Sequence, residues 1–182
     1  MNVRLATRED IPEILWTFAI ARDYMKKHDN PTQWGDDWPN QEILEEDIEK
    51  EICYVLTQEN VALGGEEILG AFTMFYGKDC DPSYAEIWPI DENDIKAEGK
   101  WISDEPYGVI HRLAGNGKAK GVANKAIDFA IDKCNGHIRI DTHAKNKTMH
   151  KILLDNGFEV TGLISVGFGE DPWRYAYEYV EK

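Results

Sequence analysis

The residues best suited to chemistry in this chain are a histidine and a run of glycines and lysines that follows it closely. His111 precedes Gly115–Gly121, a segment that holds three glycines and two lysines. Histidine exchanges a proton readily near neutral pH, so His111 is a candidate general base. Glycines let backbone N–H groups approach a phosphate, and lysines add positive charge. These residues indicate an anion-binding loop beside a proton-transfer residue.

The elements on either side of the loop would position it. Val109–Leu113 is short, apolar and β-prone, and from Val122 apolar residues recur at helical spacing. The first N–H groups of a helix lack partners and carry partial positive charge, so a strand, a loop and a helix in this order favour a bound phosphate. The P-loop pattern does not fit, because no Ser or Thr follows the loop lysines. The dinucleotide-binding pattern also fails, because Lys120 stands at its third glycine.

A second strand and helix follow the first pair. Ile138–His143 predicts a strand, and the next helix has a start signal and a stop signal. Asn146 suits an N-cap, and Gly157 suits the left-handed residue past the helix end.

These two blocks resemble the signature of the GNAT superfamily of acyl-CoA-dependent N-acyltransferases. Lys118–Ala123 is similar to the family's Gln/Arg-x-x-Gly-x-Gly/Ala turn, with lysine at the first position, and Asn146 to Gly157-Phe158 is similar to the block that follows. The resemblance covers nearly the whole chain and implies a single N-acetyltransferase domain, residues 1–182. It implies an α/β fold of the α+β type, with a mixed, mostly antiparallel sheet of about six to seven strands and about four flanking helices. One pair of strands would be parallel and splayed.

The resemblance also implies acetyl-CoA as co-substrate and no metal. The backbone amides of the turn would hold the pyrophosphate, and the pantetheine arm would lie in the splay near Leu113 and Arg139–Asp141. Met149 suits the core as well as a cofactor contact. The expected cofactor contacts are Leu113, Ala114, Lys118, Ala119, Lys120, Gly121, Val122, Ala123, Asn146 and Met149.

Direct acyl transfer requires that the amine lose a proton and that the leaving thiolate be stabilised. His111 is the first candidate for the base, and Glu86, Glu105 and Asp141 are weaker alternatives. His143 either lines the site or shapes the turn after its strand. The family often carries a tyrosine four residues before the glycine of the second block, as general acid. This chain has Leu153 there, which cannot donate a proton. Either another donor serves, such as Tyr107, His143 or a water, or the thiolate leaves unassisted.

Aromatic residues in two loops are candidates for the acceptor side. Trp34 and Trp38 lie between two predicted helices, where they either cover the core or hold an amine by cation–π contact. The stretch 79–106 has no clear period, and its aromatic residues suggest that it packs over the substrate side. The expected substrate contacts are Trp34, Trp38, Tyr84, Trp88 and Asp141.

Composition excludes several classes of protein. The net charge of −14 argues against nucleic acid as a partner. No apolar run approaches the ~20 residues of a membrane span, and no signal segment begins the chain. The three cysteines are widely spaced and odd in number, which argues against a disulfide or metal framework and favours the cytoplasm. A homodimer stays open.

The sequence therefore predicts an N-acetyltransferase that moves an acetyl group from acetyl-CoA directly to a primary amine on a small molecule. Two alternatives remain. One is a non-catalytic acyl-CoA sensor or interaction module, which Leu153 and Lys118 favour because both depart from the family pattern. The other keeps the reaction but takes a protein or peptide amine as acceptor.

Overall fold

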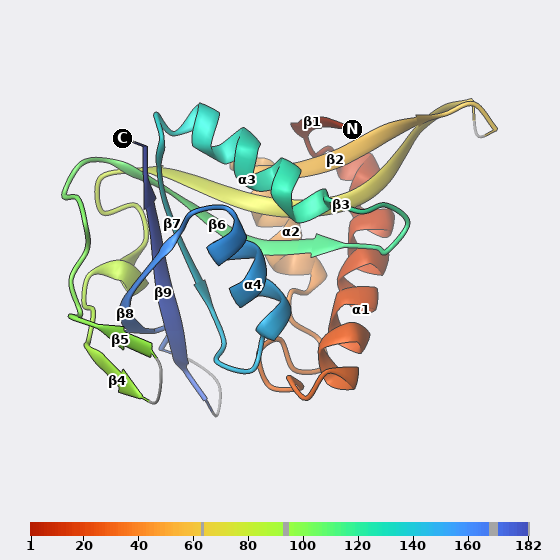
Figure 1. The fold of residues 1–182 in the computed structure, drawn as a ribbon. Coiled ribbons are helices and arrows are strands. Elements are labelled where there is room, and N and C mark those ends of the chain that lie inside the picture. Colours follow the sequence, from red (N-terminus) through yellow and green to blue (C-terminus); the bar gives the residue numbers. More distant parts are fainter. Residues whose placement is uncertain (63, 93–94, 168–170, 182) are drawn as a thin grey trace. The chain divides into compact units, whose positions relative to one another are not determined.

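The computed structural model describes residues 1–62, 64–92, 95–167 and 171–181. The chain divides into two compact units, each formed by two segments of the sequence. Unit 1 comprises Met1–Met74 and Ile110–Phe129, and unit 2 comprises Phe75–Val109 and Ala130–Lys182. Strand β6 (Tyr107–Gly115) runs from unit 2 into unit 1 (Figure 1). The expectation of a single domain over residues 1–182 stays a prediction.

Unit 1 holds the N-terminal strands and three helices, although β3 and α3 end in unit 2. Its elements are β1 (Asn2–Leu5), the 3-10 helix η1 (Arg8–Asp10), α1 (Ile11–Lys27), α2 (Gln41–Glu49), β2 (Cys53–Asn60), β3 (Gly65–Gly77) and α3 (Val122–Lys133). The predicted N-cap of α2 is confirmed, because Asn40 Oδ1 accepts a hydrogen bond from Ile43 N at 3.1 Å. The strands β1, β2 and β3 pair antiparallel in that order.

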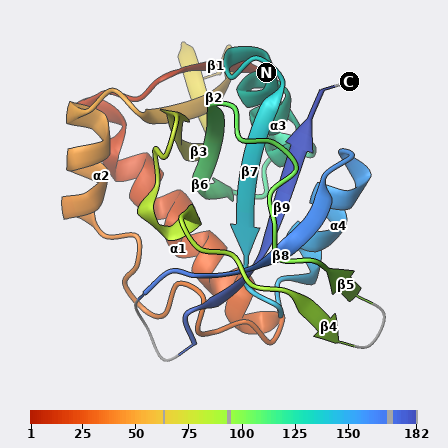
Figure 2. The ribbon, with the colours of Figure 1, turned by 90° about the vertical axis from the view of Figure 1, so that its left-hand side faces the viewer.

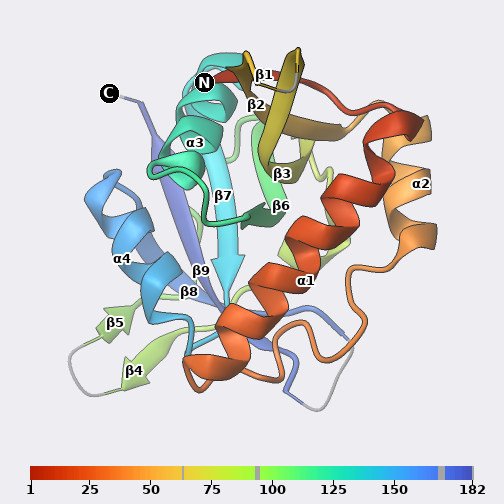
Figure 3. The ribbon, with the colours of Figure 1, turned by 90° about the vertical axis from the view of Figure 1, so that its right-hand side faces the viewer.

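Strands β2 and β3 are covered on both faces. Side chains alternate across a strand, so Val55 and its neighbour Tyr54 point to opposite sides. Val55 belongs to a buried cluster that α1 and α2 share with the strands, and Figure 3 shows these two helices next to each other. On the other face, the Tyr54 ring contacts Phe129 of α3 with centroids 5.2 Å apart. The buried cluster consists of Ala6, Ile14, Phe18, Leu44, Cys53, Val55, Ile68, Ala71 and Ala114.

Unit 2 holds the remaining strands and the last helix. Its elements are the 3-10 helix η2 (Pro82–Tyr84), β4 (Ile90–Glu92), β5 (Ile95–Ala97), β7 (His137–Thr142), α4 (Lys147–Asp155), β8 (Glu159–Ser165) and β9 (Trp173–Val180). Strands β7 and β8 both pair antiparallel with β9, and Figure 2 shows β7 and β9 running next to each other. The ring of His150 on α4 lies 5.7 Å from that of Tyr177, so α4 covers this face of β9.

A buried charged network anchors the segment before β6 within unit 2. Glu178 is fully buried and accepts hydrogen bonds from His137 at 2.7 Å, from Arg139 at 3.0 Å and from the backbone of Ile102. Burial would raise the pKa of Glu178, but these donors and the Arg139 charge outweigh it and hold the pKa below its ordinary value. Arg139 also lies 4.0 Å from the Trp101 ring centroid, which fixes the segment around Trp101 to the sheet.

In the described residues the strands form a seven-stranded sheet in the order β1-β2-β3-β6-β7-β9-β8, accompanied by a separate β4-β5 pair. The pairings of β1, β2 and β3 and those of β7, β8 and β9 are antiparallel, and β6 pairs parallel with β7 through Gly108 with Ile138 and Val109 with Arg139. With four α-helices in the same ranges, the predicted α+β architecture with one parallel pair is confirmed. The splay of this pair near Leu113 stays a prediction.

Three further features bear on the predicted class. No helix in the described ranges combines the length and apolar character that a membrane span requires. The same ranges hold no grouping of three His, Cys, Asp or Glu side chains able to bind a metal ion. None of the three cysteines forms a disulfide, and burial raises the thiol pKa of Cys53 to about 12 and those of Cys80 and Cys134 to about 11.

Candidate functional site

The glycine-rich loop between β6 and α3 lies wholly in unit 1. Gly117 and Gly121 both have φ of +79°, a left-handed conformation that favours glycine. A Cβ built at either position would meet no atom within 4 Å. The loop therefore turns twice through glycine and leaves open space beside its backbone.

The start of α3 supplies the donors that an anion needs. Helix α3 begins at Val122, and Lys125 N donates to Gly121 O at 3.0 Å. Val122 and Ala123 precede Lys125 in the first turn of the helix. In a first turn, the helix has no earlier carbonyl that could accept a hydrogen bond from the N–H groups. Gly121 has no side chain that could cap them. The local geometry fits a phosphate or pyrophosphate group, held by main-chain donors at the positive end of the helix.

Asn116 fixes the loop to strand β3. Its side chain is buried, its backbone N donates to Leu69 O at 3.0 Å, and its Nδ2 donates to Ile68 O at 2.8 Å. Asn116 Oδ1 accepts a hydrogen bond from Lys118 N at 3.1 Å. The amide of Lys118 therefore already has an acceptor within the loop.

The Lys118 side chain is 39% exposed and reaches back to strand β3. Its Nζ lies 2.6 Å from Glu67 Oε1 on β3 and 5.1 Å from the centroid of the Trp16 ring. The hydrogen bond to Glu67 raises the pKa of Lys118, and the same bond lowers the pKa of Glu67. The sequence marks Lys118 as a cofactor contact, and that role stays a prediction.

Gly70 of β3 allows β6 and α3 to come close. A Cβ on Gly70 would lie 2.5 Å from Ala114 O and 2.5 Å from Cγ1 of Val122. Only glycine allows the end of β6 and the first residue of α3 to pack this tightly on β3. Sequence reasoning missed Gly70, although a lone glycine inside a predicted strand is a signal of close backbone approach.

His111, the candidate base, lies on β6 in unit 1 and is half-buried. The next residue, Arg112, has φ of +54°, so the strand is irregular at this point. The side chains of His111, Arg112 and Leu113 are all half-buried, while Ala114 is buried. The strict alternation of a strand therefore breaks beside the candidate base.

A buried ion pair holds this irregular point of β6. Arg112 Nε and Nη2 each lie 2.9 Å from a carboxylate oxygen of Asp47, whose side chain is only 3% exposed. Thr73 Oγ1 donates to the same carboxylate at 2.7 Å. Sequence reasoning missed Asp47. The available signal was an acidic residue three positions after Leu44, on the face of α2 that carries the apolar residues.

The two tryptophans of the loop between α1 and α2 belong to unit 1 and play different structural parts. Trp34 is partly buried against the core, with its ring edge-on to Phe18 at 5.6 Å. The centroid of the Trp38 ring lies 5.9 Å from the guanidinium carbon of Arg112, so this ring makes a cation–π contact with Arg112. Trp34 therefore covers core, the first of the two readings, and contact of either tryptophan with an acceptor stays a prediction.

Tyr84, Trp88 and Asp141, the other expected substrate contacts, lie in unit 2. Tyr84 is buried, and its hydroxyl donates to Asp141 Oδ1 at 2.7 Å. Burial, and then the negative charge of Asp141, raise the pKa of Tyr84 well above its ordinary value. Trp88 is 37% exposed and packs edge-on against Trp173 at 5.2 Å.

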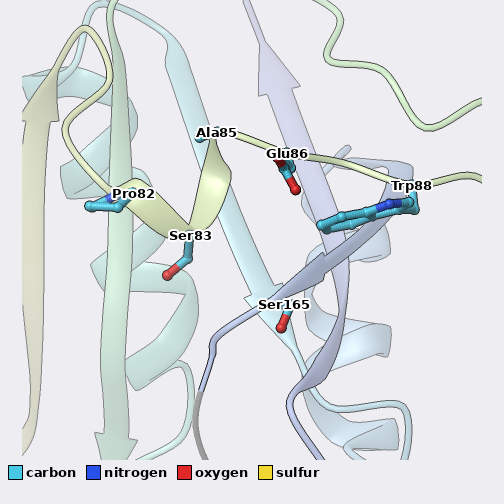
Figure 4. A pocket seen from close by; sticks show the side chains of 6 residues that line it. All are labelled: Pro82, Ser83, Ala85, Glu86, Trp88 and Ser165. Carbon is cyan, nitrogen blue, oxygen red and sulfur yellow. The ribbon is translucent and has the colours of Figure 1, made fainter.

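A shallow pocket of about 440 Å³ lies beside η2 in unit 2. Figure 4 shows that its walls come from η2, the segment that follows it, and the end of β8. Its lining residues are Pro82, Ser83, Ala85, Glu86, Trp88 and Ser165. Glu86 is the charged member of this set, and Trp88 supplies an aromatic surface. A carboxylate beside an exposed indole is suited to an ammonium group.

Hydrogen bonds from backbone N–H groups to side chains of the same segment stabilise the turn between β7 and α4. His143 is buried, its Nδ1 accepts from Lys145 N at 3.1 Å, and its Nε2 lies 2.9 Å from Asp171 Oδ2. Asn146 Oδ1 accepts from Met149 N at 3.1 Å, so the predicted cap of α4 is confirmed. His143 thus shapes the turn, and its catalytic role stays a prediction.

The other predicted site residues of unit 2 are Glu105 and Met149, and Leu153 stands at the position where the family often has a tyrosine. Glu105 is exposed, and its backbone N donates to Ser103 Oγ at 3.2 Å. Met149 is half-buried in the first turn of α4. Leu153 is fully buried, so the position where the family often has a tyrosine is filled here by a core residue. The roles of Glu105 and Met149 stay predictions.

Comparison with known proteins gives matches of fold rather than of sequence family. No family model matches the chain, and no curated protein matches it in sequence. A GNAT family acetyltransferase from Streptococcus agalactiae 2603 is 26% identical, and the match covers 100% of this chain and 95% of that chain with a TM-score of 0.80. A protein from Staphylococcus aureus Mu50 named as an acetyltransferase is 27% identical, with coverage of 98% and 97% and a TM-score of 0.65.

A third solved structure contains the expected cofactor. A Mycobacterium tuberculosis protein in complex with CoA and NLQ is 13% identical, with coverage of 88% of this chain and 72% of that chain and a TM-score of 0.50. At this identity the match concerns the fold alone. The sheet order, the parallel β6–β7 pair and the first two structures define an acetyltransferase fold. The chain belongs to the GNAT superfamily of acetyltransferases.

Proposed function

We propose that this chain is an acetyl-CoA-dependent N-acetyltransferase that acts on a primary amine of a small molecule. The observation that carries the proposal is the loop between β6 and α3. Its two left-handed glycines leave open space, and the helix begins with no side-chain cap at Gly121. Such a loop suits the pyrophosphate of coenzyme A, because main-chain donors bind it without a competing side chain.

The chain's own residues have distinct roles in this proposal. When bound, acetyl-CoA supplies the acetyl group as a thioester. The amides of Val122 and Ala123 hold its pyrophosphate, and the Arg112–Asp47 pair fixes the irregular part of β6 next to His111. His111 accepts the proton of the acceptor ammonium at an imidazole nitrogen, which leaves a neutral amine able to attack.

We propose a small cation as the acceptor class, and the lining of the pocket in unit 2, taken by itself, suits such a ligand. Glu86 and Trp88 line it, and the hydroxyls of Ser83 and Ser165 add hydrogen-bonding groups. At about 440 Å³ it has the size of a site for a small ligand. The net charge of −14 also attracts cations.

We propose the cytoplasm as the compartment, with a monomer and a homodimer both open.

Acetylation assays over a panel of amines test this function. The panel contains polyamines, arylalkylamines, amino acids and aminoglycosides, with peptides beside them for the protein-acceptor alternative. We expect thiol release with at least one small amine, and a His111→Ala variant should be slower by about 10²- to 10⁴-fold. His28→Ala is the matched control, because His28 is exposed at the end of α1. Equal activity of the two variants would remove His111 from the mechanism.

A non-catalytic acyl-CoA sensor is the second candidate, and the burial of Leu153 favours it. An enzyme that uses the tyrosine of the family would carry a proton donor at this position, whereas Leu153 offers none. The sensor predicts that CoA binds, that no amine or peptide in the panel releases thiol, and that His111→Ala changes nothing. The panel with a CoA titration therefore separates the two candidates.

A further inference from the structure

We propose that Glu67 and Lys118 form a strap that holds the β6–α3 loop in its phosphate-binding shape before coenzyme A arrives. In this account Lys118 is a positioning residue, and the main-chain amides alone contact the pyrophosphate. The inference rests on the proposed function, since it concerns the same loop. All of its residues lie in unit 1.

The acceptor side of the strap is built by the chain itself. Glu67 Oε2 accepts hydrogen bonds from Gln58 Nε2 at 3.2 Å and from Asn60 Nδ2 at 3.0 Å. Its other oxygen, Oε1, receives Lys118 Nζ at 2.6 Å. The Glu67 side chain is only 12% exposed. Two neutral donors therefore hold the carboxylate in place, so that it meets Lys118 as a fixed partner.

The lysine side of the strap is held from several directions. The ammonium contacts Glu67 and lies 5.1 Å from the Trp16 ring centroid. The backbone N of Lys118 donates to Asn116, whose own side chain is buried against β3. A charge-assisted bond of this length is among the stronger hydrogen bonds in proteins. Lys118 is thus oriented toward Glu67 and Trp16, away from the role of a free phosphate ligand, although its side chain remains 39% exposed.

A different account uses the same contacts, with the opposite consequence. Glu67 could act as a latch that withholds Lys118 from the phosphate until coenzyme A competes for it. Removing the Glu67 charge would then release Lys118 and strengthen binding. The strap predicts weaker binding instead, because a loop that is not ordered in advance must be ordered when the ligand binds. The two accounts therefore predict opposite changes in coenzyme A affinity for Glu67→Gln.

The test is calorimetric titration of the full chain with coenzyme A. Glu67→Gln and Lys118→Met should each weaken binding by about two- to fivefold, and the double variant should weaken it no more than either single change. The controls are Glu59→Gln and Lys27→Met, which change the net charge equally at exposed positions. The controls should bind within about twofold of the wild type.

Hydrogen exchange of Gly117–Ala123 without ligand gives a second measurement that does not depend on coenzyme A. The strap predicts faster exchange of these amides in Glu67→Gln and in Lys118→Met. Tighter binding by Glu67→Gln would overturn the strap in favour of the latch, and a loss confined to Lys118→Met would make Lys118 a phosphate ligand. If the wild type fails to bind coenzyme A, the proposed function fails, while unchanged exchange would overturn the strap itself.

Discussion

The two strand–loop–helix connections of this chain are built in opposite ways. After β7, the turn is made by side chains, since His143 accepts from Lys145 N and Asn146 caps α4 through Met149 N. After β6, the turn is made by glycines, and Gly121, which precedes α3, has no side chain that could cap it. Both loops lead into the N-terminus of a helix, which carries the positive end of the helix dipole.

This difference separates a structural turn from a ligand site. A capping side chain occupies the position that an anion would take at a helix start, because both bind the same N–H groups. The start of α4 is therefore satisfied by the chain, whereas Gly121 offers no side chain at the start of α3, where we propose that a phosphate binds. We therefore expect the pyrophosphate at α3 rather than at α4.

The largest predicted effect is a loss of stability on substitution of Asp47, because Asp47 holds the strand that leads into the glycine loop. Asp47→Ala leaves the guanidinium of Arg112 without its buried partner, which should lower the free energy of unfolding by about 3 kcal/mol. Urea denaturation measures this. Glu46→Ala is the control on the same helix, since Glu46 pairs with Lys50 at the exposed surface and should cost less than about 0.5 kcal/mol. Equal losses would contradict the role given to Asp47.

A smaller effect should follow removal of the side-chain cap after β7. Asn146→Ala should lower the free energy of unfolding by about 1 kcal/mol, and Asn146→Asp should restore it, because aspartate keeps the accepting oxygen. A titration with coenzyme A then separates the two interpretations of Asn146. Weaker binding by the stable Asp variant would assign the amide nitrogen to the cofactor, and unchanged binding would leave only the cap. An Ala variant as stable as the wild type would contradict the capping account.

The smallest effect concerns pH and the partner of His143. The hydrogen bond from His143 lowers the pKa of Asp171 below its ordinary value of 3.8. A lowered folded-state pKa contributes stability above the unfolded-state pKa, and this contribution is lost as the pH falls through the folded-state value. Asp171 is 48% exposed, so solvent screening limits the effect to a few tenths of a kcal/mol.

Melting temperatures between pH 3 and pH 7 check this prediction. Wild type should melt slightly above Asp171→Asn at neutral pH, and the difference should shrink as the pH falls below about 4. Glu59→Gln is the control, because Glu59 is an exposed carboxylate. A gap between wild type and Asp171→Asn that is constant over the whole range would contradict the assignment.

Local signals made much of the fold predictable from the sequence. The cap residues Asn40 and Asn146 accept the hydrogen bonds expected of them, and Gly157 has the expected left-handed φ of +80°. Such signals act within one turn of the chain, so a single sequence contains them completely. The parallel pairing of β6 with β7 followed from the strand–loop–helix order and from the family resemblance.

Contacts between distant residues could not be predicted in this way. Arg112 and Asp47 are 65 positions apart, and Lys118 and Glu67 are 51 positions apart. No periodic pattern links such residues, because only the folded sheet brings β3 and α2 to β6. The short strands β4 and β5 in the stretch 79–106 were also missed, since three residues each are too few to establish a period.

The most direct test of the account is a calorimetric titration of acetyl-CoA into the wild type, Gly121→Val and Gly64→Val. Both glycines have left-handed φ, +79° and +69°, and open space at Cβ, but only Gly121 lies at the start of α3. A side chain in this conformation costs roughly 1–2 kcal/mol, so both variants should be strained alike. We predict that Gly64→Val binds like the wild type and that Gly121→Val binds on the order of tenfold more weakly. Absence of binding by the wild type at millimolar cofactor, or equal binding by the two variants, would contradict the account.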